Sequence, residues 1–503
     1  MRLSIVLKFL GAITGIVTFW MVFPLGWSLF TASNDVFALL ESMGIGFSVA
    51  IALYLSGYNA RSEDMGGREA FLAVTLSWVI ASAIGALPYW IHESLPTYTD
   101  AYFEAMSGFT TTGSTVMTDI QSVPNGILLW RSITHWLGGM GIIVLTLAVM
   151  PLLGIRSSQL FNAESPGPIK EKLTPRIQQT AMLLWGIYVG LSALLMLLLL
   201  IGGMSFFDSL THAFATISTC GFSTKNASVG HYDSAYFDWV ITLFMFLSGA
   251  SFALHYRVLV GKKIGLFWKD PEFRFYTVIV SIASIVIAFF LFFSKNYGSL
   301  ADAFRFATFQ VVSIITTTGF ATADYELWPM GTQAIILLLM LLGGCAGSTS
   351  GGIKLIRVLV IGKHSMREFR TLLSSRIVLP LRIGDNVVEL PVISSCMAFL
   401  GIYLSILVVA SFLISLTGDD LLTCLSSVIT TLGNTGPGFH AVGPSHNFSE
   451  QTLAAKWIFS FCMLCGRLEL YTVLVLFSAP FWQETTFRFT SKKAPIIGTG
   501  RDH

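Results

Sequence analysis

The chain has 503 residues, of which 54% are apolar and only 12% are charged, and its mean hydropathy is +0.71. Soluble globular proteins carry about 25% charged residues, so this composition excludes a soluble domain and predicts a surface that lies mostly in lipid. The net charge of +2 shows no basic excess of the kind that nucleic-acid binding requires.

Apolar runs that are long enough to cross about 30 Å of hydrocarbon recur along the whole chain. The first follows Arg2 and Lys8 and continues to about Phe30, which is too long for the core of a cleavable signal peptide, so we interpret it as a retained span. In total we predict ten spans, near residues 8–30, 36–58, 70–93, 126–150, 180–203, 236–260, 275–294, 333–361, 392–416 and 457–480.

Four shorter apolar segments cannot cross a bilayer, and each leads into a Thr/Gly-rich stretch. They lie near residues 99–112, 207–220, 302–318 and 420–434. Acidic residues stand near their starts, and we interpret these as helix caps, with attraction of cations as the alternative. They are Asp100, Asp208, Asp302, Asp419 and Asp420.

The basic residues orient the chain, because cytoplasmic loops of membrane proteins are enriched in Lys and Arg. Of the 30 basic residues, 24 lie in the stretches 1–8, 61–68, 156–176, 257–274, 354–382 and 488–501. Ten spans with both termini in the cytoplasm satisfy this pattern, and they place all four Thr/Gly stretches on the outer side. The stretch 354–382 is interpreted as a topology determinant, with a docking surface for a cytosolic regulator as the alternative.

The four Thr/Gly stretches mark an internal repeat. Their glycines Gly113, Gly221, Gly319 and Gly436 are 108, 98 and 117 residues apart, and each belongs to a unit of span, half-helix, loop and span. The predicted fold is therefore an all-α polytopic membrane protein with four such repeats and two extra N-terminal spans. The predicted parts are residues 1–62 (the two N-terminal spans), 63–165, 166–268, 269–382 and 383–503, the last with a cytoplasmic tail.

Irregular backbone at membrane depth is costly, and it persists only where protein buries it or where it lines a water-filled path. Four such loops in one chain can converge on one axis, where their carbonyl oxygens replace the water shell of a cation. Glycine allows the backbone angles that inward-pointing carbonyls demand, and Thr hydroxyls add oxygen ligands, which suit hard cations. The repeat therefore predicts a cation path.

On these loops the chain resembles the Trk/Ktr/HKT superfamily of potassium transporters, and within it the bacterial TrkH/TrkG members. Three further segments carry the resemblance, which covers nearly the whole chain: Trp136-Leu137-Gly138-Gly139-Met140-Gly141, Gly343-Gly344-Cys345-Ala346-Gly347-Ser348-Thr349 and Cys465-Gly466-Arg467-Leu468-Glu469. The resemblance implies a pseudo-fourfold pore in the bacterial inner membrane with K⁺ as the transported ion. It also implies a homodimer and a cytosolic TrkA-like subunit that binds nucleotides.

The resemblance implies which residues form the potassium filter. Carried over residue by residue, they are Thr111, Thr112 and Gly113, then Thr219, Cys220 and Gly221, then Thr317, Thr318 and Gly319, and finally Asn434, Thr435 and Gly436. Only the glycine is common to all four loops, so we expect modest discrimination between K⁺ and Na⁺.

The span at 333–361 contains a run of small residues that should break its helix near the membrane centre. The run is Gly343, Gly344, Cys345, Ala346, Gly347, Ser348, Thr349, Ser350, Gly351 and Gly352. It is not a phosphate-binding loop, since no Gly-Lys-Ser/Thr follows. Close packing of small residues is one interpretation; the family resemblance implies an intramembrane gating loop below the filter.

Arg467 lies near the middle of the last predicted span, where a charge is expensive unless it faces protein or water. One interpretation is a buried ion pair with an acid on another helix. The resemblance implies instead a positive charge that projects into the cavity below the filter and repels cations.

These patterns favour a gated, channel-like potassium pore controlled by a nucleotide-binding partner. A symporter of K⁺ with H⁺ or Na⁺ is the alternative, although such transporters typically show inverted repeats and ionisable midplane relays. An intramembrane enzyme is not indicated, because no HExxH metal motif and no spanning Gly-x-Gly-Asp occurs, and no catalytic cofactor is expected.

Overall fold

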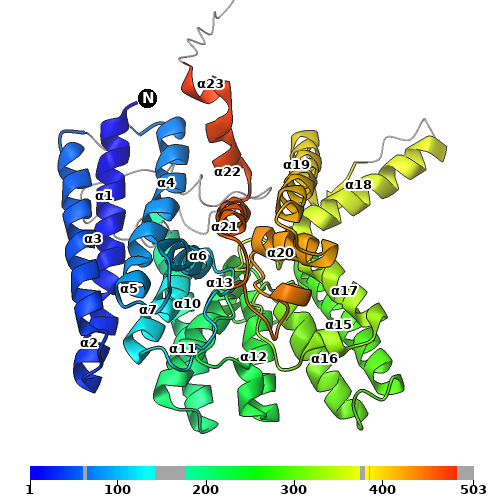
Figure 1. The fold of residues 1–503 in the computed structure, drawn as a ribbon. Helices are drawn as coiled ribbons and strands as arrows, with labels where there is room; N and C mark the ends of the chain where they lie inside the picture. Colours follow the sequence, from blue (N-terminus) through cyan, green and yellow to red (C-terminus); the bar gives the residue numbers. More distant parts are fainter. Residues whose placement is uncertain (61–64, 142–176, 374–379, 385, 484–503) are drawn as a thin grey trace, which may run out of the picture.

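The computed structural model describes residues 1–60, 65–141, 177–373, 380–384 and 386–483. Nearly all of the regular structure is helical (Figure 1). In the described residues the strands are β1 (Arg382–Ile383) and β2 (Asn386–Val387), which pair antiparallel. Six described helical segments have the length and composition of a membrane span, and two bent helix pairs raise the number to eight if each is one span. The chain is therefore a helical, multi-pass membrane protein, and the number of ten spans stays a prediction.

The N-terminal part forms a helical pair. Helices α1 (Leu3–Trp20) and α2 (Val22–Thr31) make one long segment, and α3 (Val36–Ser56) returns beside α1 (Figure 1). Close contact needs small residues: a Cβ on Gly11 would lie 2.5 Å from the backbone nitrogen of Tyr54. Glycine thus lets the two backbones approach.

The remaining helices follow the same order four times: a long helix, a short helix, a loop and a further helix. The first set is α4 (Gly67–Gly85) with α5 (Leu87–Ile91), then α6 (Tyr98–Phe109) and α7 (Asn125–Gly139); the second is α10 (Ile177–Ile201), α11 (Phe206–Ser218), and α12 (Ala235–Ser248) with α13 (Phe252–Gly261). The third is α14 (Leu266–Lys269) with α15 (Pro271–Phe293), then α16 (Leu300–Ile315), and α17 (Met330–Met340) with α18 (Leu355–Leu373). The fourth is α19 (Leu390–Ser415), α20 (Leu421–Gly433), and α21 (Leu453–Arg467) with α22 (Tyr471–Leu474) and α23 (Ala479–Trp482).

The short helices α6, α11, α16 and α20 begin with side-chain caps. Thr97, Ser205 and Ser299 each accept a hydrogen bond from the backbone N–H of an aspartate three residues later, at 3.1 Å. Asp420 itself accepts from the N–H groups of Leu422 and Thr423. Of the predicted acidic caps, Asp420 is therefore confirmed. Asp100, Asp208 and Asp302 are not the caps themselves, because Thr97, Ser205 and Ser299 take that position, but they lie in the first turn at the positive end of the helix dipole.

Two of the predicted spans are sharply bent in the structure. The segment 236–260 bends by 96° between α12 and α13, and the segment 457–480 bends by 113° between α21 and α22. At the second bend Glu469 and Leu470 adopt positive φ angles of 51° and 63°, which a helix cannot contain. The break predicted in 333–361 is present, since α17 ends at Met340 and α18 begins at Leu355. Helix α7 ends at Gly139, and the rest of the predicted span 126–150 after residue 141 lies outside the described residues.

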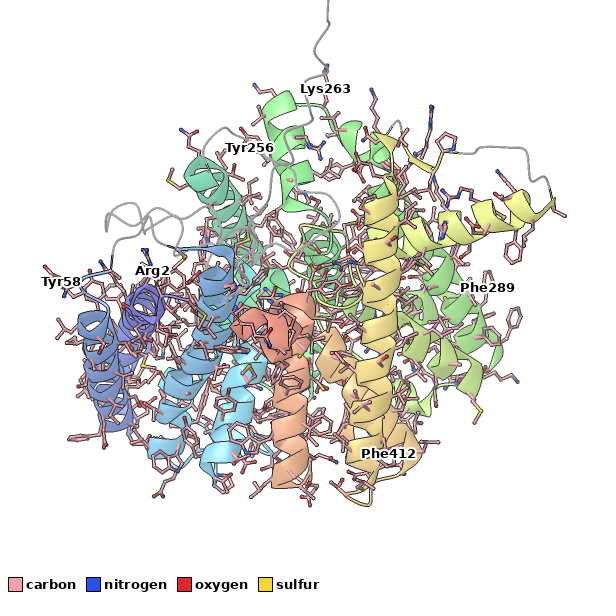
Figure 2. All side chains as sticks on the ribbon, turned by 90° about the horizontal axis from the view of Figure 1, so that it is seen from above. Arg2, Tyr58, Tyr256, Lys263, Phe289 and Phe412 are labelled. Atoms are coloured by element: carbon pink, nitrogen blue, oxygen red, sulfur yellow. The ribbon has the colours of Figure 1, made fainter. Side chains whose placement is uncertain are left out.

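Two ion pairs, one of them fully buried, join short helices to helices that follow the loops. Lys456 of α21 pairs with Asp100 of α6 at 2.7 Å, and Arg305 of α16 pairs with Asp238 of α12 at 3.4 Å. At the periphery, in contrast, apolar side chains such as Phe412 of α19, 62% exposed, project outward (Figure 2). These two ion pairs thus lie within the helix assembly, whereas apolar groups such as Phe412 face outward, as lipid surroundings require.

Candidate functional site

The four loops after the short helices have the same backbone conformation. Their first residue has a positive φ angle in each case: Thr111 (54°), Thr219 (56°), Thr317 (55°) and Asn434 (54°). Two residues later the glycine does so as well: Gly113 (85°), Gly221 (78°), Gly319 (81°) and Gly436 (101°). Left-handed threonine and asparagine are uncommon and are retained where the surrounding structure enforces them. The repeat seen in the sequence is therefore also a repeat of backbone angles.

One capping device ends all four short helices. The residue between the two left-handed positions donates its N–H to the carbonyl five residues earlier: Thr112 to Ser107 (2.8 Å), Cys220 to Ala215 (3.0 Å), Thr318 to Ser313 (2.8 Å) and Thr435 to Thr430 (2.8 Å). This is the Schellman arrangement, which satisfies carbonyls that a helix end leaves open. As a result, the negative end of each helix dipole adjoins its loop.

The four loops close into a ring. A Cβ on Gly113 would strike the carbonyl oxygen of Cys220, one on Gly221 that of Thr318, and one on Gly319 that of Thr435. A Cβ on Gly436 would lie 2.9 Å from the carbonyl oxygen of Thr112, so the fourth loop meets the first. The glycines are thus required twice, by their φ angles and by the carbonyl of the next loop.

Side chains behind the ring are engaged with each other. The hydroxyl of Thr110 lies 2.8 Å from that of Thr112, and the same pair recurs at Thr316 and Thr318 at 2.8 Å. The amide of Asn434 donates to the hydroxyl of Thr112 at 2.9 Å, which joins the fourth loop to the first. Because these side chains are hydrogen-bonded within the protein, the backbone carbonyls are the oxygen ligands best able to face a cation. Hard cations prefer such ligands.

The segment 341–354, which connects α17 to α18, lies against these loops. A parallel bridge between Leu342 and Ile353 closes its base, and its tip reaches the first residues of the loops. The hydroxyl of Thr219 donates to that of Thr349 at 3.3 Å, and the N–H of Gly351 donates to the hydroxyl of Thr317 at 2.7 Å. A Cβ on Gly351 would also lie 2.8 Å from that of Asn434. The tip therefore contacts three of the four loops.

Arg467 contacts the remaining loop. Its guanidinium donates to the hydroxyl of Thr111 at 3.1 Å and to the carbonyls of Thr349 and Gly139, both at 2.8 Å. It also donates to the carbonyl of Gly138. The nearby acid Glu469 pairs with Arg357.

The structure thus brings together most of the residues that the sequence singled out. Thr349, Ser350 and Gly351 form the tip against the loops, while Gly343, Gly344, Cys345, Ala346, Gly347, Ser348 and Gly352 form its two arms. The arms have their own contacts: the N–H of Cys345 donates to the carbonyl of Gly249 at 2.8 Å, and that of Phe252 donates to the carbonyl of Gly347 at 2.9 Å. The bend between α12 and α13 therefore contacts this segment through two backbone hydrogen bonds.

Sequence reasoning missed a buried pair behind the first two loops. Glu104 is fully buried, and its carboxylate accepts from Arg131 at 2.7 Å and from the N–H of Val116 at 2.9 Å. Arg131 also donates to the carbonyl of Ser223 at 3.0 Å, and its guanidinium lies 3.5 Å from the ring centre of Phe222. The available signal was the presence of ionisable residues within apolar segments, which marks functional positions in membranes.

A family model and several known proteins match most of this chain. The family model described as "TrkH: Cation transport protein" matches residues 43–488. The Trk system potassium uptake protein TrkH of Escherichia coli (strain K12) is 39% identical over 449 residues, which cover 89% of this chain and 92% of that protein. TrkH of Halomonas elongata is 37% identical and covers 96% of this chain and 100% of its own length.

A solved structure is similar along nearly the whole chain. The crystal structure of the potassium transporter TrkH from Vibrio parahaemolyticus matches with a TM-score of 0.86 and 34% identity, over 96% of this chain and 100% of that one. Together the matches show that this chain belongs to the TrkH family of cation transport proteins.

Proposed function

We propose that this chain takes up potassium across the bacterial inner membrane through a gated, channel-like pore, as the membrane subunit of a Trk system. The ring formed by Gly113, Gly221, Gly319 and Gly436 with the carbonyls of the neighbouring loops carries the proposal. Family membership supports potassium as the ion, since the relatives bear the name of potassium uptake proteins.

The proposed pore is pseudo-fourfold, with the ring as its filter and with the predicted residues 111–113, 219–221, 317–319 and 434–436 as its lining. Both termini are proposed to be cytoplasmic: the N-terminus and α23 lie at the same end of the molecule (Figure 1). A potential of 100 mV is worth about 2.3 kcal/mol per charge, which accumulates K⁺ roughly fifty-fold without any coupled ion.

The gate of this pore is proposed to be the segment Gly343 to Gly352 together with Arg467. The contacts of Thr349 and Gly351 with the loops support this, because a tip seated there stands in the path of an ion that leaves the ring. The charge of Arg467 adds electrostatic repulsion of a cation at the same place.

Assembly into a homodimer and control by a cytosolic, TrkA-like nucleotide-binding subunit complete the proposal. They rest on the family resemblance. Within the basic stretch 354–382, Lys354 and Arg357 are buried, and the exposed residues Lys363, Arg370 and Arg382 offer a cytoplasmic surface for that subunit. Because the four loops differ in side chains, we expect modest discrimination between K⁺ and Na⁺. Reversal potentials measured in mixed K⁺ and Na⁺ would contradict this if they showed very high selectivity.

The decisive experiment is ⁸⁶Rb⁺ uptake into liposomes that contain this protein alone, with K⁺ trapped inside and no gradient of H⁺ or Na⁺. Uptake that follows the potassium gradient and is lost in Gly113→Ala supports the pore. Uptake that requires an imposed proton or sodium gradient would replace the proposal with the symporter. Uptake that requires an added cytosolic nucleotide-binding subunit would place the gate under that subunit's control.

A further inference from the structure

Glu272 is a buried carboxylate that the filter and the gate described above do not use. It is the second residue of α15, the long first helix of the third unit, and only 9% of its surface is exposed. A buried carboxylate requires partners, because its desolvation is costly. Its partners lie in the segment that connects α17 to α18 and in the first turn of α18.

One carboxylate oxygen of Glu272 accepts two backbone N–H groups, one from an arm of that segment and one from the first turn of α18. The N–H of Ala346 is 2.8 Å away and the N–H of Ile356 is 2.9 Å away. Ala346 precedes the tip residues Thr349 and Gly351, and Ile356 follows them. The carboxylate therefore ties the arm that contains Ala346 to the start of α18.

The bond to Ile356 has a second physical effect. Ile356 is the second residue of α18, which begins at Leu355, so its N–H is one of those that a helix start leaves open. An anion is favoured there by the helix dipole. Glu272 thus caps α18 from another helix, and it holds the start of α18 and the arm of the gate at one point.

Other contacts also hold the segment: next to Ala346, the N–H of Cys345 donates to the carbonyl of Gly249 and the carbonyl of Gly347 accepts from Phe252. The tip is held by Thr317 and Arg467, and the base is held by backbone bonds between Gly343 and Ile353. If Glu272 loses its acceptor, the N–H groups of Ala346 and Ile356 are left buried without this partner, which is costly. Movement of the arms, which lets these N–H groups find other hydrogen-bond acceptors, then lowers the free energy.

We propose that Glu272 is a positioning residue that holds the segment 341–354 and the start of α18 in place against the filter, and that the pore opens when this carboxylate releases the two N–H groups. The inference deepens the proposed function, since it rests on that segment being the gate. In this proposal the segment is held in place by Glu272 of α15, a helix of the same unit, as well as by the contacts at the tip.

The test compares Glu272→Ala with Glu272→Gln in the full chain in liposomes. The amide oxygen of Gln accepts both N–H groups, whereas Ala accepts neither, so the segment should move in Glu272→Ala and stay in Glu272→Gln. Asp270→Asn is the matched control: it neutralises a carboxylate two residues away, which bonds to the N–H of Phe273 within α15.

The readout is the rate at which N-ethylmaleimide modifies Cys345, measured by mass spectrometry. Cys345 adjoins Ala346 and is 2% exposed, and Cys462 of α21, 1% exposed, serves as an internal reference. We expect about a tenfold rise at Cys345 in Glu272→Ala, which corresponds to about 1.4 kcal/mol, and no rise at Cys462. Cys345 modification at the wild-type rate, or an equal rise at Cys462, would overturn the proposal.

Resting ⁸⁶Rb⁺ flux separates this inference from the function on which it rests. Flux that rises together with Cys345 modification supports both. Modification that rises while flux does not would keep Glu272 as the hold on the segment and would reject the segment as the gate.

Discussion

Arg467 donates a hydrogen bond to the hydroxyl of Thr111 across 3.1 Å, and so joins the end of α21 to the first loop of the ring. The same guanidinium donates to the carbonyl of Thr349 at 2.8 Å. One side chain thus contacts both the proposed filter and the proposed gate. Movement of the tip must break a charge-assisted hydrogen bond, which is stronger than a neutral one.

Replacing Arg467 by Ala should raise resting ⁸⁶Rb⁺ flux by at least about tenfold. Two unit charges about 4 Å apart repel by about 4 kcal/mol at an effective dielectric constant of about 20, and the substitution removes both this repulsion and the hold on Thr349. Arg467→Lys is the control, because it keeps the charge and loses the planar fork; its flux should stay nearer to wild type. A fall in flux would contradict this prediction if the variant is expressed normally and elutes from a size-exclusion column like the wild type, which shows that it is folded.

Gly351→Ala should also raise resting flux, by displacing the tip. The added Cβ would lie 2.8 Å from the Cβ of Asn434 and against the carbonyl oxygen of Gly433, closer than atoms pack. Gly362→Ala is the matched control, since a Cβ there meets no atom within 4 Å. If both variants conduct like wild type at rest, the tip does not limit the flux.

Alanine at Gly113 or Gly319 should abolish flux. Either substitution forces a left-handed backbone on alanine, at a cost of about 1–2 kcal/mol, and places a methyl group against the carbonyl of the next loop. Gly190→Ala in α10 is the control, because a Cβ there meets no atom within 4 Å. Uptake of ⁸⁶Rb⁺ by each variant, at equal protein per liposome, makes the comparison. Full flux through Gly113→Ala would remove the ring from the ion path.

Arg131→Met should lower the stability of the protein by about 3–5 kcal/mol, the cost of leaving a buried charge without its partner. Glu104 would then lie fully buried beside an apolar side chain. The double variant Glu104→Gln with Arg131→Met should recover part of the loss, because it removes the uncompensated charge. Thermal unfolding in detergent measures the stability of the single and the double variant. Equal losses in the single and double variants would show that the unpaired carboxylate of Glu104 is not what destabilises Arg131→Met.

The cap at Asp420 should make α20 sensitive to acid. Burial alone would raise the pKa of Asp420, but hydrogen bonds from the side chain and N–H of Thr423 bring it below its ordinary value. A carboxyl whose pKa is lower in the folded state adds stability above its unfolded pKa of about 3.9, and it loses that contribution as the pH falls through the folded pKa.

Asp420→Ser tests this, because serine is also a good cap and does not titrate. We expect wild type to exceed Asp420→Ser in unfolding temperature at pH 6, and the difference to shrink as the pH approaches 3. Circular dichroism melts at a series of pH values would record it. A difference that is the same at every pH would show that the carboxylate charge is not involved.

The sequence by itself determined that the protein is a helical membrane protein, and it located the loops and the interrupted span. These features are local: the length of an apolar run, a glycine at a repeated spacing, or a run of small residues between Met340 and Leu355 has its effect wherever the chain folds. The positions of Gly113, Gly221, Gly319 and Gly436 could be predicted for the same reason, since their backbone angles need glycine in any context.

Only the tertiary structure decided which of these features meet. The bends after Ser248 and Arg467 occur in segments that read as continuous apolar helices, because the contacts that stabilise a broken backbone come from distant residues such as Gly347. Likewise, Arg467 and Thr111 are 356 positions apart in the chain, and nothing local indicates that they touch. Hydrogen bonds between residues so far apart depend on how the four units pack around the ring, and packing is a property of the whole chain.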